Sequence, residues 1–462
     1  MRHWLGFLGS LSLAANCVGG GTPSPNILIL MADDWSWPHA GALGDKTVKT
    51  PAFDRLVREG VLFDQAFVSS PSCTPSRMAI ATGQWHWRLG EARNLGGSLA
   101  KDVPTYADLL AGAGYHTGFS RKGASPSRHV YRGSDPFGPR FKNFEAFLSA
   151  RKKSAPFCFW YGSGAPHRPY VLNSGLAAGL QPDEVDVPPG LPDHPTVRRD
   201  LLDYYAAVQA FDREAAVILK QLEKAGELEN TLIVMSGDNG MPFPRAKATL
   251  YDTGTRVPLV ARWGRHAQGG RRASDFVNLC DLAPTFLEAA GLTPPKVMTG
   301  RSLFPQLKSK GSEEIDTARD HVLLGMDRHC FTHPRKALRT ARYLYIRNKN
   351  PKSWKTGRGE GPPQTFDFSR RHWPNGSKAF CFNIDPSPTK QYMLTHPDDP
   401  LVRECQAQAF GPYPGEELYD LTNDPGQRRN LAQNSDHGEA LRAIRLRLDA
   451  LWGKSIADAP DE

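Results

Sequence analysis

The chain has 462 residues, of which 40% are hydrophobic and 10% aromatic, enough for a large core and too many for a wholly disordered protein. Lysine and arginine outnumber aspartate and glutamate by 57 to 48, giving a formal charge of +9. The basic residues are spread along the chain instead of massed in one arm, which argues against a nucleic-acid partner.

Residues 1–20 have the pattern of a secretory signal peptide. A charged start, Met1-Arg2-His3, precedes an apolar stretch from Trp4 to Ala15, and small residues follow. The pattern predicts export, to the periplasm or out of the cell. A lipid anchor at Cys17 is the less favoured alternative, because the residues before it fit a lipoprotein box poorly. No apolar run reaches the roughly eighteen residues of a membrane span, which predicts no transmembrane segment.

The seven cysteines predict neither a complete disulfide framework nor a zinc site. Cys17 would leave with the signal peptide and Cys73 is set aside for chemistry, so the remaining five cannot all pair. Cys381 and Cys405 are the first pair to expect, because both lie in a strand-poor region. No cluster of cysteine and histidine has the spacing of a zinc site.

The first part of the chain alternates apolar strands with amphipathic helices. An unbroken apolar run at residues 26–31 is typical of a buried, central strand. Thr50 and Pro51 begin a helix that ends before Gly60. The longest helix, residues 197–225, keeps apolar residues at three- and four-residue spacing. The other expected elements are strands at 61–68, near 115–119, 156–161 and 231–235, and a helix at 103–111. This alternation predicts an α/β sandwich with a largely parallel sheet.

A polar stretch around residues 306–320 marks a boundary. We expect a catalytic domain over residues 24–318 and a C-terminal subdomain over residues 319–462. The expected elements of the subdomain are short strands at 321–326, 341–347 and 417–421, and a helix at 435–452. Residues 348–378, which are basic and rich in proline and glycine, are interpreted as a long surface loop.

Oxygen-bearing side chains follow two of the expected strands. Asp33 and Asp34 come directly after the first strand, and Asp238 and Asn239 follow the strand at 231–235. Ligands of open α/β sheets collect at the carboxyl ends of the strands, and these hard oxygen ligands suit Ca²⁺ or Mg²⁺. The alternative is that the aspartates only cap turns and the helices that follow.

Cys73 lies at the N-terminus of a helix that starts near Pro75. Backbone N–H groups and the helix dipole favour an anion there, which predicts either a lowered thiol pKa or a bound anionic substrate. The alternative is a small buried hydrophobic residue, the usual fate of a free cysteine.

The residues around Cys73 resemble the type I sulfatases. Residues 73–77 read Cys-x-Pro-Ser-Arg and are followed by Thr-Gly, a motif highly specific to that family. Further similarities are residues 26–34 to its first strand and metal pair, 50–56 to its first helix, and 417–431 to its C-terminal motif. The resemblance implies an alkaline-phosphatase-like sandwich with a large mixed, mostly parallel sheet, and a smaller C-terminal α+β subdomain with a short antiparallel sheet.

In that family a separate maturase oxidises the cysteine to formylglycine, so the resemblance implies that Cys73 becomes an aldehyde whose hydrate is the nucleophile. One hydroxyl of the hydrate attacks sulfur and the ester oxygen leaves. The second hydroxyl lets the adduct collapse to the aldehyde and expel sulfate. A divalent cation beside the hydrate would lower its pKa and neutralise sulfate charge.

The resemblance also implies a role for each matching residue. Arg77 would stabilise the hydrate, Lys122 and Lys247 would bind sulfate, and His167 would protonate the leaving oxygen as general acid. The implied metal ligands are Asp33, Asp34, Cys73, Asp238 and Asn239. Taken alone, each lysine is more often a solvated surface charge, and His167 an ordinary loop histidine.

One position departs from the family pattern. The family commonly has a histidine two residues after the first sulfate-binding lysine, and here that position is Ala124. The histidine that assists sulfate expulsion is therefore missing. His86 and His129 are candidate substitutes, and slow turnover or a sulfate pocket adapted to another substrate also fits the change.

Residues 238–244, Asp-Asn-Gly-Met-Pro-Phe-Pro, resemble the N-sulfoglucosamine sulfohydrolase branch, which includes bacterial enzymes acting on algal polysaccharides such as ulvan. Residues 327–329 and 334–335 are similar to the substrate loop of that branch. Arg328, His329 and Arg335 are therefore candidate sugar contacts, with simple surface charges as the alternative. Residues 85–87, Trp-His-Trp, offer a stacking surface for a sugar ring, although burial is the commoner role of such aromatics.

The favoured hypothesis is a sulfatase acting on an O-sulfated glycan such as ulvan. Three alternatives remain: an N-sulfoglucosamine sulfohydrolase acting on heparan fragments, a phosphonate or phosphate ester hydrolase of the same superfamily, and a catalytically dead glycan-binding protein. The last is motivated by Ala124, and the otherwise complete set of catalytic residues argues against it.

Overall fold

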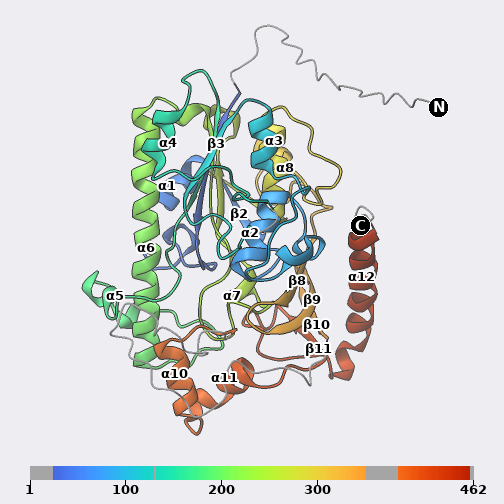
Figure 1. Ribbon diagram of the computed structural model, residues 1–462. Coiled ribbons are helices and arrows are strands. Elements are labelled where there is room, and N and C mark those ends of the chain that lie inside the picture. Colours follow the sequence, from blue (N-terminus) through green and yellow to red (C-terminus); the bar gives the residue numbers. More distant parts are fainter. Residues whose placement is uncertain (1–23, 130–131, 350–382, 458–462) are drawn as a thin grey trace, which may run out of the picture.

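A mixed seven-stranded sheet forms the centre of the computed structural model, which describes residues 24–129, 132–349 and 383–457 (Figure 1). The strand order is β3 (His116–Arg121), β4 (Phe157–Gly162), β1 (Asn26–Ala32), β5 (Thr231–Gly237), β6 (Leu259–Arg262), β2 (Val61–Phe67) and β7 (Arg271–Asn278). The four neighbours from β3 to β5 are parallel, whereas β6 is antiparallel to both of its neighbours. All of β1 is buried, as its unbroken apolar run predicts.

Helices cover both faces of this sheet (Figure 1). Side chains of β1 alternate between two cores, since Leu28 and Leu30 belong to one and Ile27 and Ile29 to the other. The first core includes α1 (Pro51–Glu59), α4 (Phe144–Ala150) and α6 (Pro195–Lys224); the second includes α2 (Cys73–Thr82), α3 (Tyr106–Gly112) and α8 (Leu282–Ala289). The predicted α/β sandwich is confirmed.

A second, four-stranded antiparallel sheet follows in the chain. Its order is β11 (Glu416–Asp420), β10 (Tyr343–Asn348), β9 (Thr332–Thr340) and β8 (His321–Arg328). Helix α12 (Gly438–Ala457) packs on it through Leu441, Ile444 and Leu448. The expected antiparallel sheet is confirmed, but no strand was expected at β9, where residues 334–335 were interpreted as part of a substrate loop. The sequence analysis also missed β6, which is only four residues long, and β7, which begins with two arginines.

Residues 383–410, which lie between β10 and β11 in the chain, pack in the first core. Ile384, Met393 of α10 (Pro388–Thr395), and Val402 of α11 (Pro400–Phe410) pack in the same core as α6. The remaining short helices are α5 (Ser174–Ala177), α7 (Asp252–Thr255) and α9 (Phe304–Lys308). Residues 383–410 therefore pack with the residues that precede residue 318, although the expected boundary assigned them to the C-terminal subdomain.

Several sequence predictions fall on residues that the structure does not describe. These are the signal peptide at residues 1–20, Cys381, and nearly all of the loop expected at residues 348–378. The expected partner of Cys381, Cys405, is a buried free thiol in α11. In the part of the chain that is described, no helix is both long and apolar enough to cross a membrane.

Asp212 of α6 ties α1 to the core, and we expect its loss to destabilise the fold. Its carboxylate accepts hydrogen bonds from the backbone N–H groups of Ala52 and Phe53, at 3.0 and 2.9 Å. Asp212→Ala leaves two N–H groups at a helix start without this acceptor, which costs about 2–4 kcal/mol of unfolding free energy. Urea unfolding measures it. As a control, Asp193→Ala removes an exposed ion pair with Arg198 and should change the value by less than about 0.5 kcal/mol. Equal effects would contradict this account.

Candidate functional site

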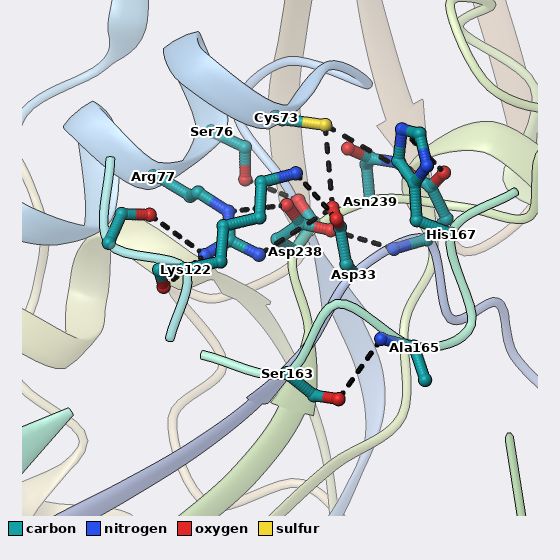
Figure 2. A network of polar contacts seen from close by, with 12 residues as sticks. Asp33, Cys73, Ser76, Arg77, Lys122, Ser163, Ala165, His167, Asp238 and Asn239 are labelled. Atoms are coloured by element: carbon teal, nitrogen blue, oxygen red, sulfur yellow. Dashed lines mark hydrogen bonds and ion pairs between the residues drawn. The ribbon is translucent and has the colours of Figure 1, made fainter. Parts of the chain in front are cut away.

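The candidate metal ligands and catalytic residues meet at the carboxyl edge of the four parallel strands (Figure 2). Asp33 and Asp34 follow β1, Asp238 and Asn239 follow β5, and Lys122 follows β3. The loop after β4 carries His167. Because the carboxyl ends of neighbouring parallel strands share one edge, the sheet brings together residues more than 200 positions apart.

Cys73 is the first residue of α2 and is buried at the centre of the site. Its Sγ lies 3.5 Å from Asp33 Oδ1 and 4.0 Å from Asp34 Oδ1. Burial raises the pKa of the Cys73 thiol above its ordinary value, so the lowered thiol pKa that its helix position suggested is wrong. Desolvation of a thiolate in this pocket outweighs the attraction of the helix N-terminus and the nearby lysines.

The strand-end oxygens are held in place by short contacts among themselves. The backbone N–H of Asp34, a residue with φ of 72°, donates to Asp238 Oδ1 at 2.9 Å. Asn239 Nδ2 donates to Asp34 Oδ1 at 2.7 Å, which leaves Asn239 Oδ1 buried without a hydrogen-bond partner among the described residues.

This oxygen set fits a divalent cation. Asp33, Asp34 and Cys73 each offer a ligand atom, and these atoms lie within 4.8 Å of one another. A buried amide oxygen with no donor, next to two carboxylates, is an arrangement that a hard cation would complete. The alternative role of the aspartates as simple turn caps does not account for it.

Three cations face the three carboxylates. Arg77 Nε donates to Asp238 Oδ2 at 2.7 Å, Lys122 Nζ lies 2.5 Å from Asp33 Oδ2, and Lys247 Nζ lies 2.8 Å from Asp34 Oδ2. Burial alone would raise the pKa of Asp33, but the nearby charges, Lys122 foremost, lower it well below its usual range. Burial raises the pKa of Asp238 to about 6. All three cations are therefore ion-paired inside the site, not solvated on the surface.

His167 is the most exposed of the catalytic candidates, with 31% of its side chain accessible. Its Nδ1 is hydrogen-bonded to the carbonyl oxygen of Arg168 and is therefore the protonated nitrogen. Its Nε2 lies 3.9 Å from Asp34 Oδ2. The ring thus presents Nε2 to the cluster around Cys73, as a residue that exchanges a proton with a bound molecule must.

The three candidate sugar contacts have different surroundings. His329 is buried beside the residue that precedes Cys73, since its Nδ1 lies 2.8 Å from Ser72 Oγ. Burial, followed by the charge of Lys247, lowers the pKa of His329 to about 3. Arg328 is exposed at the end of β8. Arg335 is buried in β9, and its guanidinium lies 4.0 Å from the ring centroid of Tyr413.

His86 and His129 are the two substitutes expected for the missing histidine. In the described part of the chain, the polar side-chain contacts of these two histidines are with Ser69 and Asp135, not with Cys73. Ala124 is fully buried, and its N–H donates to Asp135 at 3.1 Å. His129 lies 3.3 Å from the same carboxylate. His86 is buried with its Nδ1 2.8 Å from Ser69 Oγ.

The aromatic residues 85–87 pack within the protein. Trp87 stacks on Trp452 of α12 with ring centroids 4.1 Å apart, and Trp85 stacks on Trp87 at 5.3 Å. They join the second sheet's helix to the rest of the structure, which is the commoner role of such residues, not that of a sugar platform.

Sequence reasoning missed Asp385. Its Oδ2 lies 3.3 Å from Lys247 Nζ, and the charges around it, Lys247 first among them, lower its pKa to about 2 despite burial. No periodicity or motif surrounds this residue, and it is 138 positions from its partner, so nothing in the local sequence signals the contact.

Comparisons with known proteins agree on one family. A model of the sulfatase family matches residues 25–133 and 139–292, more than half of the chain, and a model of the N-sulphoglucosamine sulphohydrolase C-terminal region matches residues 245–356. An ulvan-active sulfatase from Formosa agariphila is 29% identical over 94% of this chain and 75% of that protein. Human N-sulphoglucosamine sulphohydrolase is 26% identical over 94% and 92%.

The fold is also shared with a solved structure. A protein crystallised in complex with its substrate D-glucosamine-2-N,6-O-disulfate has a TM-score of 0.68 at 19% identity, covering 95% of this chain and 99% of that one. At that identity the likeness is one of fold, and it agrees with the alkaline-phosphatase-like sandwich that the sequence resemblance implied.

We expect a divalent cation to stabilise the protein through the strand-end oxygens. After treatment with a chelator, Ca²⁺ or Mg²⁺ at about a hundredfold excess over its Kd should raise the unfolding free energy by about 2.7 kcal/mol, measured by denaturant unfolding. Asn239→Ala removes the unpartnered oxygen and should abolish most of that gain. Asn26→Ala, a buried asparagine bonded to Glu227 outside the site, should lose stability but keep the response. An identical response in all three proteins would refute the assignment.

Proposed function

This chain belongs to the sulfatase family, the hydrolases of sulfate esters, and we propose that its substrate is an O-sulfated polysaccharide or oligosaccharide, such as ulvan. The single observation that carries the proposal is the position of Cys73, buried among Asp33, Asp34 and the ion-paired cations at the sheet edge. A site built only for binding has no need of a nucleophilic side chain at its centre.

The charge of the site suits a sulfate ester. Asp33, Asp34, Asp238 and Asp385 carry four negative charges against the three positive charges of Arg77, Lys122 and Lys247, so the net charge of the protein part is close to −1. Ca²⁺, with Mg²⁺ as the alternative, would be held by Asp33, Asp34, Asp238 and Asn239 with the modified Cys73, and would supply Lewis-acid stabilisation of the sulfate charge. The loaded site then has a net positive charge, which favours an anion.

The chain's own residues divide the remaining work. Cys73, converted by a maturase to formylglycine, would provide the attacking oxygen. Arg77, fixed by Asp238 and by the carbonyl oxygens of Lys122 and Gly123, would orient that group. Lys122 and Lys247 would transfer part of their interaction from the carboxylates to sulfate oxygens. His167 in its doubly protonated form would donate the Nε2 proton to the leaving oxygen and become the neutral ring, which keeps the Nδ1 proton on the Arg168 carbonyl.

The preference for an O-sulfated glycan rests on two observations. The ulvan-active relative is more similar to this chain than human N-sulphoglucosamine sulphohydrolase is, and the position of the family histidine is Ala124. His329, beside Ser72, and exposed Arg328 would contact the sugar next to the sulfate, with Arg335 supporting them from β9. Export of the protein, proposed from residues 1–20, would place it where large polysaccharides occur.

Sulfate release tests the proposed function directly. Protein co-expressed with a maturase should release sulfate from O-sulfated ulvan or carrageenan oligosaccharides, and Cys73→Ala should release none, measured by ion chromatography. Release only from a glucosamine N-sulfate disaccharide would contradict the substrate proposal. No release from any of these substrates, with mass spectrometry showing that Cys73 is converted, would contradict the enzymatic proposal and favour a glycan-binding protein.

Lys247 should contribute to the chemical step. Lys247→Met removes a buried cation that faces the sulfate and should lower kcat/KM by about 10²–10³-fold, the usual effect of deleting one group that stabilises developing charge. Lys336→Met is the matched control, because Lys336 pairs with Asp449 at the surface and lies 5.5 Å from the ring centroid of Trp452. A loss below about threefold for Lys247→Met would show that this lysine does not act on the sulfate.

A further inference from the structure

Arg168 is a buried arginine directly after His167 in the chain, and its side chain joins distant parts of the structure. It forms a two-pronged ion pair with Asp200 of α6, with Nη1–Oδ1 at 2.8 Å and Nη2–Oδ2 at 2.9 Å. Its Nε donates to the carbonyl oxygen of Pro242 at 2.9 Å, in the turn that follows Asn239. Only 3% of the side chain is exposed. Each of its three guanidinium nitrogens therefore has a hydrogen-bond partner inside the protein.

Asp200 is itself held from the C-terminal part of the chain. Thr389, at the start of α10, donates its hydroxyl to Asp200 Oδ2 at 2.6 Å, and its backbone N–H lies 3.3 Å from the same oxygen. The rings of Tyr170 and Phe243 lie on the Arg168 guanidinium, with centroids at 4.4 and 4.5 Å. Such a packed, bidentate arginine has one available position.

The link to the chemistry is the carbonyl oxygen of Arg168. His167 Nδ1 is hydrogen-bonded to that oxygen, so the position of the Arg168 backbone decides the tautomer and the direction of His167 Nε2. Anchoring the Arg168 side chain at α6, α10 and the turn after Asn239 fixes this backbone relative to the metal-ligand residues. The same segment, residues 383–395, also supplies Asp385 to Lys247.

We propose that Arg168, held by Asp200, which Thr389 holds in turn, is a positioning residue that aims His167 Nε2 at the leaving oxygen of the sulfate ester. This inference rests on the proposed function, in which His167 is the proton donor. The competing account is that the Arg168–Asp200 pair only stabilises the fold, as many buried ion pairs do.

Leaving-group dependence separates the two accounts. A sugar alkoxide is a poor leaving group and needs a proton as the S–O bond breaks, whereas a nitrophenolate leaves without one. A misdirected His167 therefore slows hydrolysis of a sugar sulfate and hardly affects 4-nitrophenyl sulfate. A purely structural defect lowers the activity on both substrates by the same factor, because it reduces the amount of folded enzyme.

The experiment compares kcat and KM on an O-sulfated ulvan oligosaccharide and on 4-nitrophenyl sulfate. Thr389→Val removes one hydroxyl group and changes the side-chain volume little. Arg168→Lys keeps the positive charge but loses the two parallel hydrogen bonds to Asp200. We expect both variants to lose about 10–100-fold in kcat on the sugar sulfate, the scale of a misplacement of about 1 Å, and less than about threefold on the aryl sulfate. His167→Ala should show the same asymmetry in stronger form.

Two controls make the result decisive. Arg319→Lys alters an equally buried arginine whose Nη1 lies 2.7 Å from Asp281 Oδ2. This pair is not part of the site, so the substitution should change both activities by the same factor. Thermal unfolding identifies variants that do not fold, and Thr389→Val then decides alone. Uniform losses on both substrates, or no loss on the sugar sulfate, overturn the positioning role. A wild type that cleaves neither ester overturns the proposed function, and this inference with it.

Discussion

Three buried carboxylates converge at one edge of the sheet, and the rest of the site depends on how their charges are compensated. Removing Asp33, Asp34 and Asp238 from water is costly, and mutual repulsion adds to that cost. Arg77, Lys122 and Lys247 offset it, each with a contact of 2.5–2.8 Å to one carboxylate. Since each cation comes from a different segment, this compensation also fixes the positions of α2, of the loop after β3 and of the turn after β5.

The same compensation prepares the site for an anion. The lysines are bound to carboxylates that a divalent cation would also bind, so in the proposed mechanism a bound cation would free part of each ammonium group for sulfate oxygens. The protein thereby avoids leaving buried charges unpaired before the substrate is present. Burial keeps the unmodified Cys73 thiol neutral, with its pKa raised, so the free cysteine is a poor nucleophile in this pocket.

Segments outside the large sheet complete the site. His329 follows the end of β8 in the second sheet and contacts Ser72, the residue before Cys73. Asp385 and Thr389 arrive from the segment before and within α10, and contact Lys247 and Asp200. A boundary drawn near residue 318 separates the two sheets in sequence, but the polar network crosses it. Residues that are far from the chemistry in the sequence are therefore able to act on His167 and Lys247.

Local sequence located the metal-ligand candidates and placed Cys73 near a helix N-terminus, whereas the family resemblance gave Cys73 its expected role as nucleophile. Asp33, Asp34, Asp238 and Asn239 follow apolar strands, and Cys73 begins a helix, so simple pattern rules place them at the sheet edge. The longest helix and the alternation of strands and helices were equally clear, because burial imposes a period on neighbouring residues. Lys122, His167 and Lys247 have no such local mark, and only the family resemblance singled them out.

Tertiary structure alone decided the remaining contacts. Arg168 meets Asp200, Asp200 meets Thr389, and Lys247 meets Asp385, across separations of 32, 189 and 138 positions, which no local period encodes. Strand β9 was missed because its pairing with β8 and β10, not its own composition, makes it a strand. Sequence thus determines which chemical groups are present and which strand ends carry them, whereas packing decides which charges neutralise one another, because ion pairing depends on distance in space.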